Sequence, residues 1–138
     1  MYDVYLGGYA GTEWRNKFSD MIGDDITIFD PIEDGYDQFD DVQKANLVAK
    51  ELQHIEESQI IIFYLTKEWN SQFSMLELGD AVGRGKQVVV CIDGKIDGEE
   101  KIRRFCEYRG VLFVDNLDDL VTVTEEFLGQ IELCQHVA

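Results

Sequence analysis

The sequence predicts an α/β fold in which a single, doubly wound, five-stranded parallel sheet carries helices on both faces. Two observations predict this class. Short apolar segments alternate along the chain with longer segments of helical period. The strongest segment, residues 60–65 (IIIFYL), is apolar at every position, which indicates a central strand covered on both faces. Because 138 residues suit one core, we expect residues 1–138 to form a single domain.

The first half of the chain is expected to hold three strands and two helices. Residues 4–8 form a short strand that ends in glycines, and residues 12–22 place their large apolar side chains on one side of a helix. A second strand at 26–29 is ended by Asp30-Pro31. An acidic loop then leads to a helix at 39–57, which precedes the central strand.

The second half repeats the alternation. It predicts a helix at 73–83, a buried strand at 87–92, a helix at 99–108, a short strand at 111–114 and a closing helix at 117–133. Ligands of flavodoxin-like and Rossmann-like sheets bind beyond the carboxyl ends of the strands, near the point where the strand order reverses. We therefore seek site residues at 7–15, 30–41, 64–77 and 93–98.

The charge of the chain excludes some classes of partner. The 12 Lys and Arg residues stand against 28 Asp and Glu residues, for a formal net charge of −16. DNA, RNA and anionic membranes attract proteins with a surplus of Lys and Arg, so we expect neither a nucleic acid polymer nor a membrane as partner. The start, MYDVYL, lacks the basic and apolar parts of a signal peptide. We expect a soluble cytoplasmic protein.

Cysteine and histidine are scarce. Cys91, Cys106 and Cys134 are widely spaced and form no C-x-x-C motif, so we expect reduced, buried thiols. His54 and His136 are the two histidines of the sequence, so a His-based zinc site or a Ser-His-Asp triad is poorly supported. We expect no metal and no cofactor, and any chemistry must depend mainly on carboxylates.

Residues 79–86 (GDAVGRGK) have a superficial likeness to a phosphate-binding loop. The spacing differs from G-x4-G-K-[ST], and Gln87 stands where that motif needs a hydroxyl residue. We interpret the segment as the end of a helix followed by a strand.

The acidic segment 30–41 has a partial likeness to a calcium loop. Ile32 stands where a ligand is required, and Asp41 stands where a bidentate Glu is usual. Eight of the 28 acidic residues lie at 24–41, and we interpret this region as a solvated rim or a lid over the substrate.

Gly7-Gly8-Tyr9-Ala10-Gly11 lies between the first strand and the first helix, where an anion or a sugar is often bound. The segment departs from G-x-G-x-x-G, and Asp30 lies just past the second strand. A binding turn and a plain tight turn both remain open for it.

Glu77 is the carboxylate that stands out. It lies between Leu76 and Leu78 in the segment ELGDA, close to the start of the helix that follows the central strand. The helix dipole there favours the ionised form. A first-turn Glu in a salt bridge is the plain alternative.

Several segments in this order carry a resemblance. They are Tyr5-Leu6-Gly7-Gly8, residues 14–17 (WRNK), Glu51, Asn70-Ser71 and residues 77–81 (ELGDA). Over most of residues 2–92 the set resembles the nucleoside 2-deoxyribosyltransferase family, including its nucleotide N-hydrolase branch.

The resemblance implies a role for each matched residue. Glu77 corresponds to the nucleophile, and Tyr5 corresponds to the tyrosine that orients it. Glu51 corresponds to the acid that contacts the nucleobase and assists its protonation. Ser71, beside Asn70, corresponds to the residue that holds the sugar hydroxyls.

Two positions depart from the family pattern. Transferases often carry Asp at the position of Ser71, whereas the hydrolase branch uses serines near the sugar and phosphate. Gly110 lies about where a neighbouring subunit of the family supplies an Asn, so that contact is in doubt.

The resemblance implies a transferase of nucleotide salvage that moves a deoxyribosyl group from a nucleoside to a free nucleobase. Glu77 would form a covalent deoxyribosyl intermediate, and Glu51 would protonate the departing base. The same Glu77 suits an N-hydrolase of deoxynucleosides or their monophosphates. A binding module without turnover is the third possibility. A homo-oligomer is expected by resemblance only.

The remaining candidates have open alternatives. Trp14, Tyr36 and Phe39 either cover a base or pack within the fold. Arg15 either meets a 5′-phosphate beside Gly7 and Gly8 or forms a surface ion pair. The acidic region 24–41 tolerates a neutral nucleoside better than a charged nucleotide, and this favours nucleosides.

Overall fold

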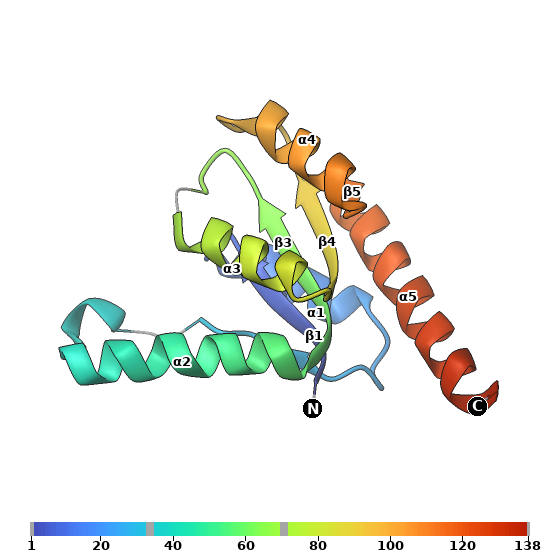
Figure 1. Ribbon diagram of the computed structural model, residues 1–138, viewed down its shortest axis with the longest axis horizontal. Helices are drawn as coiled ribbons and strands as arrows, with labels where there is room; N and C mark the ends of the chain where they lie inside the picture. The colour runs from blue at the N-terminus through green and yellow to red at the C-terminus, as the bar shows by residue number, and fades with distance from the viewer. Residues whose placement is uncertain (1, 33–34, 70–71, 138) are drawn as a thin grey trace.

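The computed structural model describes residues 2–32, 35–69 and 72–137 and shows strands alternating with helices (Figure 1). In chain order the elements are β1 (Tyr2–Gly8), α1 (Thr12–Met21), β2 (Ile28–Phe29), the 3-10 helix η1 (Tyr36–Gln38), α2 (Asp41–Glu57), β3 (Ser58–Leu65), α3 (Gln72–Gly83), β4 (Gln87–Ile92), α4 (Glu99–Arg109), β5 (Leu112–Val114) and α5 (Leu117–Val137).

The strands form one five-stranded sheet in the order β2-β1-β3-β4-β5, and every neighbouring pair is parallel. This is the order of flavodoxin-like sheets, so the predicted fold class is confirmed. The chain moves outward from β1 in one direction to β2 and in the other direction to β3 and beyond. The order therefore reverses between β1 and β3, and the carboxyl ends of these two strands are the expected place for a ligand.

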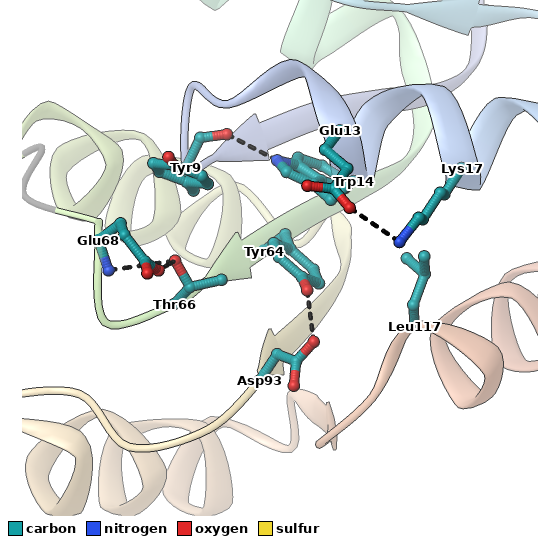
Figure 2. Close-up of a pocket in the computed structure, with 9 residues that line it drawn as sticks. All are labelled: Tyr9, Glu13, Trp14, Lys17, Tyr64, Thr66, Glu68, Asp93 and Leu117. Carbon is teal, nitrogen blue, oxygen red and sulfur yellow. Dashed lines mark hydrogen bonds and ion pairs between the residues drawn. The ribbon is translucent and has the colours of Figure 1, made fainter.

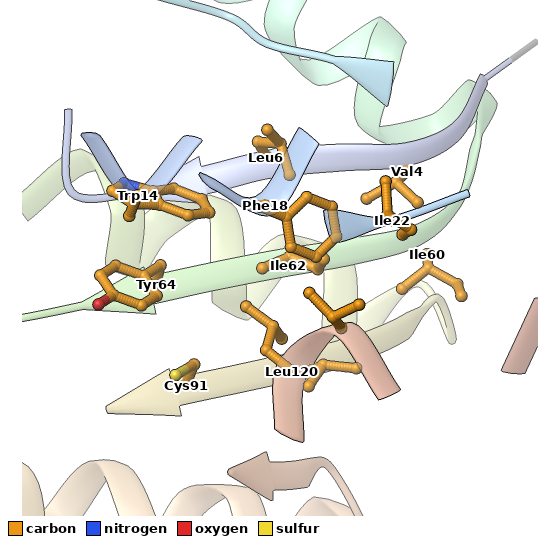
Figure 3. Close-up of a cluster of buried hydrophobic side chains, with 12 residues drawn as sticks. Val4, Leu6, Trp14, Phe18, Ile22, Ile60, Ile62, Tyr64, Cys91 and Leu120 are labelled. Carbon is orange, nitrogen blue, oxygen red and sulfur yellow. The ribbon is translucent and has the colours of Figure 1, made fainter. Parts of the chain in front are cut away.

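Helices cover both faces of the sheet. In Figure 1, α2 and α3 cross in front of the strands and α1 lies behind them. Figure 3 shows the core on the α1 and α5 side, where Phe18 and Leu120 pack against Leu6 and Ile62. The other core lies under α2, α3 and α4 and includes Tyr5, Ile55, Phe63, Leu78, Val90 and Cys106.

The burial of the central strand β3 on both faces accounts for its apolar residues 60–65. Ile60, Ile62 and Tyr64 belong to the core on the α1 side, whereas Ile61, Phe63 and Leu65 belong to the other core. Side chains of a strand alternate between faces, so a strand buried on both faces is apolar throughout. Full burial of one such aliphatic side chain contributes about 1.5–3 kcal/mol.

Most element boundaries differ from the sequence prediction by a few residues, and two of these differences have local reasons. Helix α2 begins at Asp41 because Asp40 caps it: the Asp40 carboxylate accepts from the Gln43 nitrogen, and the Gln43 side chain accepts from the Asp40 nitrogen. Strand β2 begins at Ile28, because the Thr27 nitrogen donates to the Asp3 carboxylate at 2.8 Å.

The segment GDAVGRGK closes a helix, as interpreted from the sequence. Helix α3 ends at Gly83, Gly85 has φ +74°, and the Lys86 nitrogen donates to the Ala81 oxygen. Gly110 ends α4 in the same left-handed conformation, with φ +68°. These are C-terminal helix caps, in which glycine is preferred because it lacks a Cβ.

One expectation for the cysteines was wrong. Cys91 and Cys106 are buried and behave as small apolar side chains, but Cys134 is exposed near the end of α5. Burial raises the pKa of the Cys91 thiol to about 12. Within the described ranges, no helix has both the length and the apolar composition that crossing a membrane requires.

Candidate functional site

Glu77 is a buried carboxylate at the centre of the candidate site. Its side chain points from α3 toward β1, and the residue is 6% exposed. The Tyr5 hydroxyl, from the middle of β1, donates to Glu77 Oε2 at 2.8 Å. Tyr5 is fully buried, so a rigid strand holds one oxygen of the carboxylate in a fixed place.

The environment of Glu77 acts on its charge in both directions. Burial raises the pKa of Glu77 above its ordinary value, and the Tyr5 hydrogen bond and the Arg15 charge oppose this effect only in part. Glu77 is the sixth residue of α3, beyond the first turn, so the helix dipole expected from the sequence acts on it only weakly. The pKa of Tyr5 is raised by burial and by the Glu77 charge, so Tyr5 remains a neutral donor.

Arg15 lies inside the protein and not on its surface. It is 2% exposed, and its Nη1 donates to the Leu6 oxygen and to Asp30 Oδ1, both at 2.8 Å. Its Nη2 donates to the Tyr9 oxygen at 2.9 Å. The sequence interpretation as a surface ion pair is wrong about the arginine, which is buried, whereas contact with a 5′-phosphate stays a prediction. Burial lowers the pKa of Arg15, and Asp30 opposes that effect.

The described acids of the 24–41 region form a solvated rim. Asp24, Asp25, Asp37 and Asp41 are exposed, as one of the two sequence interpretations proposes. Asp30 differs from these residues because its carboxylate pairs with Arg15, although 44% of its side chain remains exposed. Asp30 therefore links the rim to the buried groups.

Glu51 lines a cavity of about 420 Å³, and the other residues that line this cavity are apolar or aromatic. Glu51 is half-buried on α2, and its charge contributes to the raised pKa of Tyr5. Helix α2 contributes Ile55 to the core that contains Tyr5, so the cavity lies on the Tyr5 side of the sheet. Its lining consists of Ala10, Pro31, Ile32, Tyr36, Leu47, Val48, Glu51 and Phe73.

Gly7 and Gly8 lie at the end of β1, opposite Phe63 and Tyr64 of β3. Gly8 has φ +98°, and a Cβ there would come within 2.6 Å of the Tyr64 nitrogen. A Cβ on Gly7 would come within 3.1 Å of the Ile62 oxygen. Close approach of two strands at the point where the order reverses therefore requires both glycines.

Trp14 lines a different cavity, of about 450 Å³, which Figure 2 shows on the α1 side of the sheet. The Trp14 ring stacks on Tyr64 with centroids 4.6 Å apart, and its indole nitrogen donates to the Tyr9 oxygen. Tyr64 in turn donates to Asp93, just past β4. Tyr5 and Trp14 thus belong to the cores of opposite faces.

The structure brings together part of the set predicted from the sequence. Tyr5 bonds to Glu77, the charges of Arg15 and Glu51 act on this pair, and Asp30 completes the group through Arg15. Asn70 and Ser71 lie outside the described residues. Within the described ranges, no group of three or more His, Cys, Asp or Glu side chains is placed to hold a metal ion.

Sequence reasoning missed most of the apolar lining around Glu51. Leu47 and Val48 precede Glu51 by four and three residues, so helical spacing alone places all three on one side of α2. Phe73 comes from α3 and gives no such local signal. Tyr36 was named from the sequence, and it lines the cavity.

Comparison with known proteins adds independent information. The family model described as "Nucleoside 2-deoxyribosyltransferase like" matches residues 1–95. A search of curated proteins found no match.

Solved structures show the same fold. A 2-deoxyribosyltransferase from the psychrotolerant bacterium Bacillus psychrosaccharolyticus is 15% identical, with a TM-score of 0.63 over 86% of this chain and 90% of that one. A conserved protein from Enterococcus faecalis V583 is 14% identical, with a TM-score of 0.58 over 91% of this chain and 98% of that one.

Proposed function

The chain belongs to the nucleoside 2-deoxyribosyltransferase-like family, and from this premise we propose that it transfers a 2-deoxyribosyl group between nucleobases. The donor is a 2′-deoxynucleoside and the acceptor is a free nucleobase. The observation that carries the proposal is the hydrogen bond from Tyr5 to the buried Glu77, on the side of the sheet where Glu51 faces an apolar cavity.

Glu77 is the proposed nucleophile. Its carboxylate attacks C1′ from the face opposite the base, so a C1′–O bond forms as the N-glycosidic bond breaks. The electron pair of the broken bond leaves with the base. Since Tyr5 bonds to Oε2, the carboxylate is oriented before the substrate arrives, and Oε1 takes no part in this hydrogen bond.

Glu51 is the proposed proton donor to the departing base. A nucleobase leaves easily only when it is protonated, so an acid beside it lowers the barrier. Glu51 faces a cavity with apolar walls, where Tyr36 and Phe73 offer rings to a planar base. The second base then attacks C1′ from the vacated face, and the C1′–O bond to Glu77 breaks with its electron pair returning to the carboxylate. Glu51 takes the proton of the incoming base, and the configuration at C1′ is retained.

The placement of Arg15 supports a neutral nucleoside over a nucleotide. Arg15 is only 2% exposed and its charge is already paired with Asp30, so little of the guanidinium is open to a 5′-phosphate. The exposed rim acids, such as Asp37 and Asp41, would also repel a phosphate.

The cellular setting is also a proposal. We propose a cytoplasmic homo-oligomer of nucleotide salvage, built from a single domain at residues 1–138, because the family resemblance implies such an assembly. Light scattering coupled to size-exclusion chromatography will give the mass of the assembly, and a monomer in solution would contradict the oligomer.

The decisive experiment compares Glu77→Gln and Glu77→Ala with the unmodified protein in exchange of a base between a deoxynucleoside and a free nucleobase. We expect both substitutions to lower exchange by at least about a thousandfold, since covalent catalysis requires the carboxylate. Asp80→Asn is the matched control, because Asp80 lies one turn further along α3 and pairs with Arg84 at the surface.

Chromatography of the products distinguishes the alternatives. Full activity in either Glu77 variant would refute its assignment as the nucleophile. Release of free base at a rate unaffected by the acceptor, with no new nucleoside, would replace the transferase by an N-hydrolase. Binding of nucleosides without glycosidic cleavage would show that the protein is a binding module without turnover.

A further inference from the structure

Arg15 occupies the place where the pairing of β1 with β2 stops. Strand β2 pairs only with Val4 and Tyr5 of β1, so Leu6 is the first residue beyond this pairing. Arg15 Nη1 donates to the Leu6 oxygen, and Nη2 donates to the Tyr9 oxygen. One side chain of α1 therefore holds both carbonyls that flank Gly7-Gly8.

Asp30 binds the same guanidinium from the other strand. It follows β2 directly, and its Oδ1 accepts from Arg15 Nη1 at 2.8 Å. The ends of β1 and β2 are thus tied to one buried cation. Because 44% of the Asp30 side chain is exposed and only 3% of the Arg15 side chain is, water screens the anion better than the cation.

We infer that Arg15 is a positioning residue for Glu77: it fixes β1 at Leu6, the residue after Tyr5, and supplies the buried positive charge that stabilises the Glu77 carboxylate. This inference rests on the proposed function for its catalytic meaning. Arg15 acts through its neighbours, since its terminal nitrogens donate to Leu6, Tyr9 and Asp30.

The charged and titratable groups around Glu77 come from four parts of the chain. Tyr5 on β1 donates to the carboxylate, and Arg15 on α1 supplies the opposite charge. Glu51 on α2 acts on Tyr5, and Asp30 after β2 acts on Arg15. Burial favours the protonated acid, so Arg15 and Tyr5 together must oppose it if the nucleophile is to be ionised.

The sign of each substitution follows from this arrangement. Removing the Arg15 charge raises the pKa of Glu77, so a higher pH is needed to ionise it. Removing the Asp30 charge leaves Arg15 less neutralised and lowers the pKa of Glu77. A role limited to holding the β1 end would not give opposite shifts in the two variants.

The first test measures Glu77 directly, without substrate. The ¹³C signal of its side-chain carboxyl group, identified as the signal missing from Glu77→Gln, is followed through a pH titration. We expect the midpoint to rise in Arg15→Met, to stay near that of the unmodified protein in Arg15→Lys, and to fall in Asp30→Asn. Arg15→Gln serves in place of Arg15→Met if the latter does not fold.

Lys17→Met is the matched control, because Lys17 lies on the same helix but is exposed and pairs with Glu13. It removes the same charge outside the site, so its midpoint should equal that of the unmodified protein. A midpoint unchanged in a folded neutral Arg15 variant, or a shift as large in Lys17→Met, would overturn the inference.

The second test is the pH profile of kcat/KM for base exchange. The acidic limb should move in the same direction as the titration midpoint, and Arg15→Met should lower kcat about tenfold at neutral pH with KM little changed. Absence of exchange in the unmodified protein would refute the proposed function alone, because the titration still decides the role of Arg15. An unmoved limb in an active enzyme would refute the role of Arg15 alone.

Discussion

A carboxylate that is only 6% exposed, such as Glu77, is expensive for a protein to keep ionised. Loss of hydration costs several kcal/mol unless hydrogen bonds and an opposite charge replace the water. Tyr5 and Arg15 provide these two substitutes from different elements. Burial outweighs both, so the pKa of Glu77 lies above its ordinary value, and a buried carboxyl group with such partners is a functional candidate on physical grounds alone.

Tyr5→Phe tests the hydrogen bond in isolation, since it removes one oxygen and keeps the ring. We expect kcat/KM for base exchange to fall about 10–100-fold, because a hydrogen bond to a charged group contributes about 1.5–3 kcal/mol. The loss should be larger at low pH, since the Tyr5 hydroxyl lowers the pKa of Glu77. Steady-state kinetics across pH will measure both effects.

Tyr2→Phe is the control for this substitution. Tyr2 lies on the same strand, but its ring packs against Phe29 and His54. Equal kinetics in Tyr5→Phe, Tyr2→Phe and the unmodified protein would show that the hydroxyl of Tyr5 does not orient the nucleophile.

The residues of this pair show what the sequence reveals and what it conceals. Tyr5 and Glu77 are 72 residues apart, so no periodicity relates them, and only the family resemblance suggested the pair. The burial of Arg15 was not predicted because arginine is usually exposed. Helical spacing also does not reveal that β2 pairs with β1 only as far as Tyr5, which leaves Leu6 beyond the pairing.

At the level of elements, the strongest local signals gave the best predictions. Strand β3 was recognised because its residues 60–65 are all apolar, and β4 matches the predicted residues 87–92. Prediction was poorer where side chains decide the boundary: Asp40 sets the start of α2, and the Asp3 carboxylate accepts from the Thr27 nitrogen just before β2. Such bonds depend on geometry that a linear pattern does not contain.

Gly8→Ala tests whether β1 and β3 must approach closely at the site. Alanine at this position would have to adopt a left-handed backbone conformation, and its Cβ would clash with the Tyr64 backbone. We therefore expect the free energy of unfolding to fall by about 2–5 kcal/mol. Gly94→Ala is the matched control, because Gly94 has φ +93° with no atom within 4 Å of its Cβ position.

The two variants separate the conformational cost from the steric one. Gly94→Ala should cost only about 1–2 kcal/mol, the price of the left-handed conformation by itself. Urea denaturation followed by circular dichroism will measure both. Equal losses in the two variants would show that the strands can separate at Gly8 without cost.

For the whole molecule, the net charge of −16 sets a limit on how far ion pairs can stabilise it. Even if each of the 12 Lys and Arg residues paired with an acid, 28 − 12 = 16 acids would have no such partner. Several of the ion pairs join residues three or four positions apart within one helix, as in Arg103 with Glu99. Exposed pairs of this kind contribute about 0.3–0.5 kcal/mol each, so repulsion among the surplus acids should exceed them.

Salt should therefore stabilise the folded protein. Raising sodium chloride from 20 to 500 mM shortens the screening length from roughly 20 to 4 Å, which weakens repulsion among the acids more than it weakens contact pairs. We expect Tm to rise by roughly 3–5 °C, which corresponds to about 1 kcal/mol, in scanning calorimetry. Potassium chloride should act equally, because screening does not depend on the cation.

A charge variant connects this effect to the acidic rim. Asp24 and Asp37 are exposed and lie outside the Arg15–Asp30 pair, so the double substitution Asp24→Asn and Asp37→Asn removes two rim charges. Its Tm should exceed that of the unmodified protein at 20 mM salt, and the difference should shrink at 500 mM, because salt already screens the repulsion that the substitution removes. A Tm that falls with added salt, or a variant less stable at low salt, would show that specific pairs of the rim outweigh its repulsion.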